Sequence, residues 1–118
     1  MMVEFALVFL LLVTVITLIA EGGILFGAWL AATNAAREGA RYGAPCLNRT
    51  VDGCTITDVQ TVATDRTNGF PGVFTVPTPV ISGGTVTVTV VANVSSVAPV
   101  VGDLTVYGES TMRLENQP

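Results

Sequence analysis

The chain has 118 residues, half of them hydrophobic, with nine acidic residues, five basic residues, no histidine and a net charge of −4. This length allows one domain, and an acidic chain with no cluster of basic residues argues against nucleic-acid binding. The absence of histidine, lysine, a nucleophile elbow and a phosphate-binding loop argues against an enzyme, and no cofactor or metal site is expected.

An apolar run opens the chain. The segment Phe5–Ala20 has no charged residue, and its two polar residues, Thr14 and Thr17, can bond back into a helix. After Glu21 the apolar character resumes and continues to Ala32. Since about 20 apolar residues cross a bilayer, we predict a membrane-spanning helix with Glu21 near one boundary.

The helix is expected to continue through the segment TNAAREGARYGAP, because alanine and arginine favour helix. Gly43 and Pro45 indicate its end. A helix over residues 2–43 would be roughly 60 Å long. Its weak point is Glu21-Gly22-Gly23, because each glycine lowers helix propensity by about 1 kcal/mol.

The start of the apolar run differs from that of a secretory signal. No basic residue precedes it, it is too long, and no clear small-residue cleavage site follows it. A plain membrane anchor is the simpler interpretation, although an anchor also carries flanking basic residues. The abrupt opening Met-Met-Val-Glu suggests that a leader has already been removed, or that the N-terminal amine supplies the missing charge.

Cys46 and Cys54 bound the loop segment CLNRTVDGC. Two cysteines without histidine make a poor metal site, so we predict a disulfide, which implies an oxidising, extracytoplasmic location. Such a bridge would add about 2–3 kcal/mol to a small domain. The alternative is two unpaired loop thiols.

Asn48 and Asn93 are candidate glycosylation acceptors, since each begins an N-x-[ST] triplet.

The segment TITDVQTVATDRTNGF has two interpretations. Apolar residues at helical spacing favour a short helix that starts at Thr57 or Asp58 and stops at Asn68-Gly69. Its threonine and valine content also permits a strand.

Three β segments follow. In residues 72–82, Pro77 and Pro79 indicate an edge or irregular strand. The segment TVTVTVVANV alternates with period two, which predicts one buried face, and Gly83-Gly84 before it predicts a turn. A last strand in residues 104–115 has a candidate bulge at Gly108. Its expected inward residues are Leu104, Val106, Met112 and Leu114.

The predicted fold class is therefore α+β. A long N-terminal hydrophobic helix, residues 1–44, would pack on a small C-terminal antiparallel β-sheet domain of three or four strands, residues 45–118.

The carboxylates of Glu4 and Glu21, in the apolar segment, each allow two interpretations. Glu4 is either a favourable charge at a helix start or the partner of a free α-amine, that of Met1 or of a neighbouring subunit. Glu21 lies about 25 Å further along the helix. It is either an interfacial charge, or it pairs with an arginine or lies beside unwound backbone at Gly22-Gly23.

The segments VEFALVFLLLVTVITLIAEGGILF and NAAREGARYGA resemble the TadE-like family of tight-adherence pilins, which belong with the type IVb pilin-like proteins. The C-terminal order TVTVTVVANV, APVVGDL and ESTMRLE is also similar to the family pattern. The segment from Cys46 to Pro79 carries no such motif.

The resemblance implies a role for Glu4 as the glutamate that pairs with a subunit N-terminus during assembly, with Met1 and Phe5 beside it. The helix would be held in the inner membrane and later buried in a filament. A prepilin peptidase would remove a basic leader, and the new terminus can be methylated. The family glutamate is usually fifth in the mature chain, whereas here it is fourth, which leaves the paired amine open.

The leading hypothesis is a pilin subunit of an extracellular filament for surface attachment, aggregation or biofilm formation. Its partners would be copies of itself, the pilus assembly machinery, the prepilin peptidase and, before assembly, the inner membrane. We predict that the helix kinks or melts at Glu21-Gly22-Gly23 on assembly. The alternatives are a membrane-anchored extracytoplasmic binding module and a minor pseudopilin outside the main filament.

Overall fold

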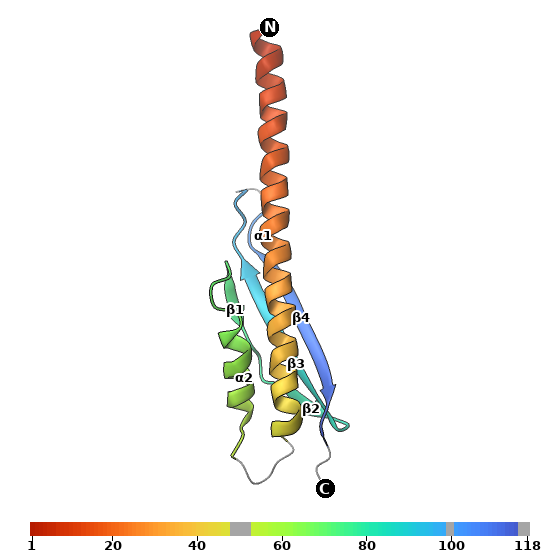
Figure 1. Cartoon of the computed structure of the whole chain (residues 1–118). Helices are drawn as coiled ribbons and strands as arrows, with labels where there is room; N and C mark the ends of the chain where they lie inside the picture. Colours follow the sequence, from red (N-terminus) through yellow and green to blue (C-terminus); the bar gives the residue numbers. More distant parts are fainter. Residues whose placement is uncertain (48–52, 99–100, 116–118) are drawn as a thin grey trace.

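The computed structural model describes residues 1–47, 53–98 and 101–115 of the chain. The molecule is a long helical rod with a small sheet and a second helix along one half of it (Figure 1), and it measures 78 × 18 × 18 Å. The predicted α+β class, with a long N-terminal helix packed on a small antiparallel sheet, is confirmed.

The rod is the continuous helix α1, Met2–Cys46. It is longer than predicted at its C-terminus, because Pro45 lies inside the last turn instead of stopping it. A proline there removes one backbone hydrogen bond without interrupting the turns before it. The turn is closed by Leu47, whose N–H donates to the carbonyl oxygen of Gly43 at 3.0 Å.

The strand β3, Thr85–Val94, is the centre of the sheet. Along one edge it pairs with β4, Leu104–Arg113, over its full length. Two short strands, β1, Val73–Thr75, and β2, Val80–Ser82, pair with opposite ends of β3 along its other edge. All pairings are antiparallel.

The prediction of an edge or irregular strand in residues 72–82 is confirmed, since two short edge strands form there. Pro77 and Pro79 lie between β1 and β2, where the chain leaves the sheet. Proline cannot donate a hydrogen bond to a neighbouring strand, which confines it to such positions. The predicted turn at Gly83-Gly84 joins β2 to β3, and both glycines have positive φ (58° and 75°), as the common two-residue hairpin turns require.

The second helix, α2, Ile56–Asp65, confirms the helical interpretation of this segment over the strand. It begins earlier than predicted, because its N-cap is Thr55 and not Thr57 or Asp58. Its buried residues, Val59 and Ala63, pack on α1. There they meet Gly39 and Gly43, which have no side chain to keep the two helices apart.

The core lies between an alanine-rich face of α1 and a valine-rich face of β3. The period-two prediction for β3 is confirmed, since alternate residues of this strand are buried. The fully or almost fully buried members from the two elements are Ala28, Ala32, Ala35, Ala36, Ala40 and Ala44 of α1, and Val86, Val88, Val90, Ala92 and Val94 of β3. Small side chains allow the helix to lie close to the sheet.

The predicted bulge at Gly108 is wrong. Gly108 pairs directly with Val90 in an unbroken ladder. It is instead a point where the backbone of α1 lies directly against the strand: a Cβ on Gly108 would lie 2.5 Å from the carbonyl oxygen of Ala32. A glycine inside a strand marks either a bulge or such a close approach. The predicted inward residues Leu104, Val106, Met112 and Leu114 are all partly buried.

Candidate assembly site

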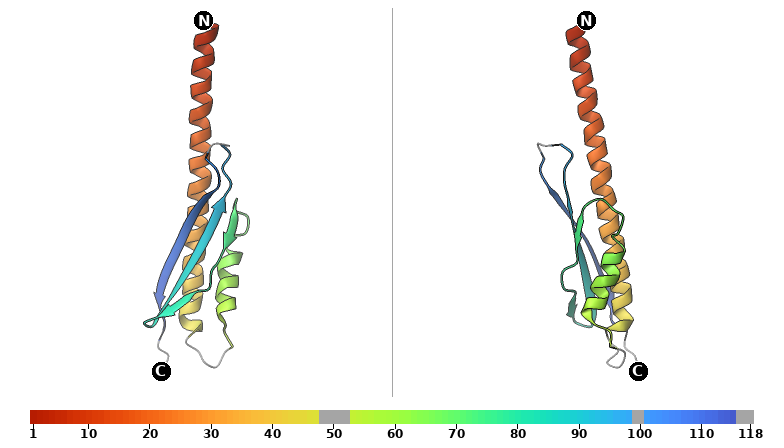
Figure 2. Two further views of the ribbon diagram at one scale, coloured as in Figure 1. Left: turned by 180° about the vertical axis from the view of Figure 1, so that it is seen from behind. Right: turned by 90° about the vertical axis from the view of Figure 1, so that its left-hand side faces the viewer.

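The first half of α1 extends beyond the sheet (Figure 2). The apolar side chains of this half are exposed. Its large hydrophobic residues from Met1 to Ile19 are between 43% and 102% exposed. Within the described ranges, α1 is the one helix long and apolar enough to cross a membrane by length and composition, and its most apolar window is 0% buried. An isolated subunit therefore exposes a large apolar surface, which is typical of a site that binds a membrane or another protein.

Glu4 and Met1 lie at the free end of this surface. Both side chains are exposed, and no ion pair of Glu4 occurs in the part of the chain that the structure describes. The carbonyl oxygen of Met1 accepts from the N–H of Phe5 at 3.2 Å, which starts the helix. The Phe5 ring stacks on Phe9, with ring centres 6.2 Å apart. The carboxylate of Glu4 is thus open to a group from another molecule.

Among the described residues, the carboxylate of Glu21 accepts hydrogen bonds from Ser96 and Ala98, which both lie in the connection between β3 and β4. Its Oε1 atom accepts from the backbone N–H of Ala98 at 2.6 Å and from the hydroxyl of Ser96. Bonds from donors to an ionised carboxylate are roughly twice as strong as neutral ones. Glu21 therefore ties the middle of α1 to a segment more than seventy residues away in sequence.

Neither of the two interpretations of Glu21 made from the sequence included Ser96 or Ala98 as partners. In the single chain it pairs with no arginine among the described residues, and the backbone beside it at Gly22 and Gly23 is helical. A Cβ on either glycine would meet no atom within 4 Å. The two glycines are therefore not required by packing in the isolated subunit, and the predicted melting on assembly stays a prediction.

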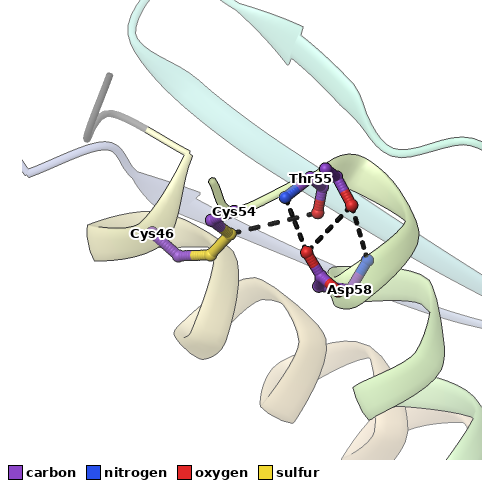
Figure 3. Close-up of a disulfide and its surroundings, with 4 residues drawn as sticks. All are labelled: Cys46, Cys54, Thr55 and Asp58. Atoms are coloured by element: carbon purple, nitrogen blue, oxygen red, sulfur yellow. Dashed lines mark hydrogen bonds between the residues drawn. A yellow bond between two sulfur atoms is a disulfide. The ribbon is translucent and has the colours of Figure 1, made fainter. Parts of the chain in front are cut away.

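Cys46 and Cys54 are bridged, as predicted, with their Cα atoms 5.8 Å apart (Figure 3). The bridge joins the last residue of α1 to the residue before the N-cap of α2. It lies at the C-terminal end of α1, whereas the exposed apolar surface lies at the N-terminal end. The bridge therefore fixes the start of α2 to the end of α1.

Directly after the disulfide, Thr55 and Asp58 form a capping box (Figure 3). The carboxylate of Asp58 accepts from the N–H of Thr55 at 2.7 Å and from its hydroxyl at 2.8 Å, while the hydroxyl accepts from the N–H of Asp58 at 3.3 Å. These two donors of Thr55, the N–H first, hold the pKa of Asp58 below its usual value. Asp58 thus has a structural role.

Of the two candidate glycosylation acceptors, Asn48 lies outside the described residues. Asn93 is exposed near the end of β3, where its Oδ1 atom accepts from the hydroxyl of Thr105 at 2.8 Å. In the described ranges, no group of three His, Cys, Asp or Glu side chains could hold a metal ion.

The family model of the TadE-like proteins matches residues 1–41 of the chain. No curated protein and no solved structure matches the chain. The match suggests a part in a tight-adherence pilus, and the apolar helix suggests membrane anchoring. Over residues 1–41, which include Glu4 and the exposed apolar surface, the resemblance inferred from the sequence is confirmed, and the chain is similar to the TadE-like family.

Proposed function

We propose that the chain is a structural pilin subunit that polymerises into an extracellular, tight-adherence-like filament for surface attachment, aggregation or biofilm formation. The observation that carries this proposal is the exposed apolar half of α1 in a chain whose other half of α1 is packed. Each fully buried large apolar side chain contributes about 1.5–3 kcal/mol. Exposure of this surface to water is therefore unfavourable, so that either lipid or the helices of other copies must cover it.

Two environments would bury the surface in turn. In the inner membrane, lipid surrounds the helix, and in the filament, the helices of neighbouring copies replace the lipid. Within the bilayer every backbone polar group must be bonded inside the helix, and the continuous α1 meets this requirement. The assembly machinery and a prepilin peptidase are the further partners of this route.

Glu4 would set the register between subunits. Its carboxylate is exposed at the N-terminal end of α1, where it can meet the α-amine of an adjacent copy. A buried pair of this kind is strongly sensitive to loss of one partner, because the remaining charge has no compensation. We also propose that the chain has no enzymatic activity.

Two alternatives differ in what covers the helix. A membrane-anchored binding module would keep it in the bilayer, with the sheet as the recognition surface. A minor pseudopilin would enter the assembly without forming most of the filament. The proposed role as the main subunit rests on the small size and lollipop shape of the chain, with one long helix, one short helix and one sheet.

The proposal can be tested by shearing filaments from cells that express the wild-type chain, Glu4→Gln or the control Asp65→Asn. Asp65 is an exposed carboxylate in α2, far along the chain from Glu4. We expect Glu4→Gln to disappear from the sheared fraction while its membrane level is unchanged, and Asp65→Asn to be recovered like the wild type. Equal recovery of Glu4→Gln would contradict the role of Glu4. Absence of the wild-type chain from the sheared fraction would favour the anchor.

A further inference from the structure

The described parts of the connection between β3 and β4, residues 95–98 and 101–103, lie at the end of the sheet nearer the exposed apolar half of α1 (Figures 1 and 2), and they contact α1 through Glu21. No residue from Val94 to Gly102 is charged. Two of its valines are solvent-exposed, Val97 at 63% and Val101 at 49%. Two exposed valines of an uncharged segment therefore lie near the exposed apolar surface of α1.

Glu21 fixes the position of this connection. Its carboxylate binds the residues on both sides of Val97, through the Ser96 hydroxyl and the Ala98 N–H. The same carboxylate lines a small crevice together with Val97 and the helix residues Ile24 and Leu25. Apolar side chains of α1 and of the connection thus meet in this crevice, and its polar members are Ser95, Ser96 and the carboxylate of Glu21.

The length of the helix sets the depth of this place in a membrane. Residues 2–20 span about 28 Å at 1.5 Å per residue, which is close to the hydrocarbon thickness of about 30 Å. If these residues cross the bilayer, Glu21 lies where the hydrocarbon ends. Ser96, Val97 and Ala98 then lie at the same level, because they are bonded to Glu21 or adjacent to residues that are.

We propose that Val97 and Val101 enter the membrane interface beside α1 while the subunit is held in the bilayer, and that Glu21 sets their depth. A lipid surface fits this site, because exposed apolar side chains without charge gain free energy at the boundary of headgroups and acyl chains. The inference rests on the membrane-embedded stage of the proposed function. Glu21 would then position this segment at the lipid boundary, where its carboxylate accepts hydrogen bonds from two donors of the same segment.

The test uses the full chain in phosphatidylcholine–phosphatidylglycerol vesicles that contain lipids spin-labelled either near the headgroup or deep in the acyl chain. The chain has one tryptophan, so Trp29→Phe gives a background in which an introduced tryptophan is the only one. The reporter is Val97→Trp. The deep control is Phe9→Trp in α1, and the solvent control is Val80→Trp in β2, at the opposite end of the sheet.

We expect the fluorescence of Val97→Trp to shift to the blue and to lose intensity with the headgroup label more than with the deep label. Phe9→Trp should be quenched most by the deep label, and Val80→Trp by neither. Addition of Glu21→Ala to Val97→Trp should reduce the quenching, whereas quenching of Phe9→Trp should not change.

The proposal is overturned if Val97→Trp behaves like Val80→Trp while Phe9→Trp is quenched, which would leave membrane anchoring intact. A blue shift that grows with protein density but shows no quenching by lipid would place the connection against a second copy, and would also overturn it. If Phe9→Trp is not quenched by either label, both this inference and the membrane stage of the proposed function fail.

Discussion

The backbones of Gly108 in β4 and Ala32 in α1 lie so close together that no side chain fits at position 108. A Cβ on Gly108 would meet the backbone of both Ala32 and Thr33, and lie 2.5 Å from the carbonyl oxygen of Ala32. Both sides of this contact are backbone, so neither can move aside like a flexible side chain. The contact fixes the point at which the helix crosses the sheet.

Gly108→Ala is therefore expected to lower the free energy of unfolding by about 1–3 kcal/mol, the usual cost of overpacking. The measurement is thermal unfolding of the full chain in detergent micelles, followed by circular dichroism. The control is Gly27→Ala in α1, where a Cβ meets no atom within 4 Å. It should raise helix stability by about 1 kcal/mol. A Gly108→Ala variant that unfolds at the wild-type temperature would show that the helix does not approach the strand so closely.

The disulfide between Cys46 and Cys54 closes a loop with a sequence separation of 8 residues. Replacement of both by serine is expected to lower the free energy of unfolding by about 2–3 kcal/mol, by the loop-entropy estimate. The thermal midpoint should fall, and a reducing agent should lower that of the wild type but not that of the double variant. A wild-type midpoint that is insensitive to reductant would argue against a stabilising bridge.

The capping box of α2 is expected to give a pH-dependent contribution to stability. The pKa of Asp58 is lowered by the N–H and hydroxyl of Thr55, and its unfolded value is about 3.9. Because the folded-state pKa is the lower one, the contribution is fully present above about pH 3.9 and is lost as the pH falls through the folded-state pKa.

The comparison for this prediction is between the wild type and Asp58→Asn, which cannot titrate. The difference in free energy of unfolding between them should be constant above about pH 3.9 and should shrink as the pH falls through the folded-state pKa of Asp58. Other carboxylates are the same in both chains and cancel. A difference that does not change with pH would mean that the charge of Asp58 does not strengthen the cap.

The pair Gly22-Gly23 is expected to permit local melting of α1 on assembly. Alanine at both positions fits the isolated subunit, since no atom lies within 4 Å of either Cβ. It should strengthen the helix by about 1 kcal/mol per position. The double variant should therefore reach the membrane normally but yield fewer filaments, while Gly27→Ala should assemble like the wild type.

A filament reconstruction by electron cryomicroscopy examines the same prediction directly. The helix should be interrupted between Glu21 and Gly23 in the assembled subunit. A helix that is continuous through Gly23 in the filament would show that the hinge prediction is wrong.

Local sequence patterns are sufficient to predict those parts of the fold that depend on interactions between residues close in sequence. The alternation in TVTVTVVANV predicts the buried face of β3, and the two prolines predict an edge or irregular strand before it. The true start of α2 was also present as a signal, because Thr55 and Asp58 have the spacing of a capping box. Apolar spacing alone indicates Thr57 or Asp58 as the start, whereas the capping box identifies Thr55.

The features that sequence patterns missed depend on contacts between distant segments. Gly108 gives the same local signal for a bulge as for a close approach, and only the position of α1 decides between them. Glu21 finds its donors in Ser96 and Ala98, and no periodicity links the helix to that connection. Ser96 is one of two adjacent serines in an unremarkable loop, so its role follows only from the fold.

The central claim is that the chain leaves the membrane and becomes the main part of an extracellular filament. The most direct measurement is mass spectrometry of material sheared from intact cells, with identification of the N-terminal peptide. We predict that the chain dominates this fraction and that its peptide starts at Met1 or one residue away, with or without a methyl group. Recovery of the chain from membranes alone, with an unprocessed start, would contradict the account.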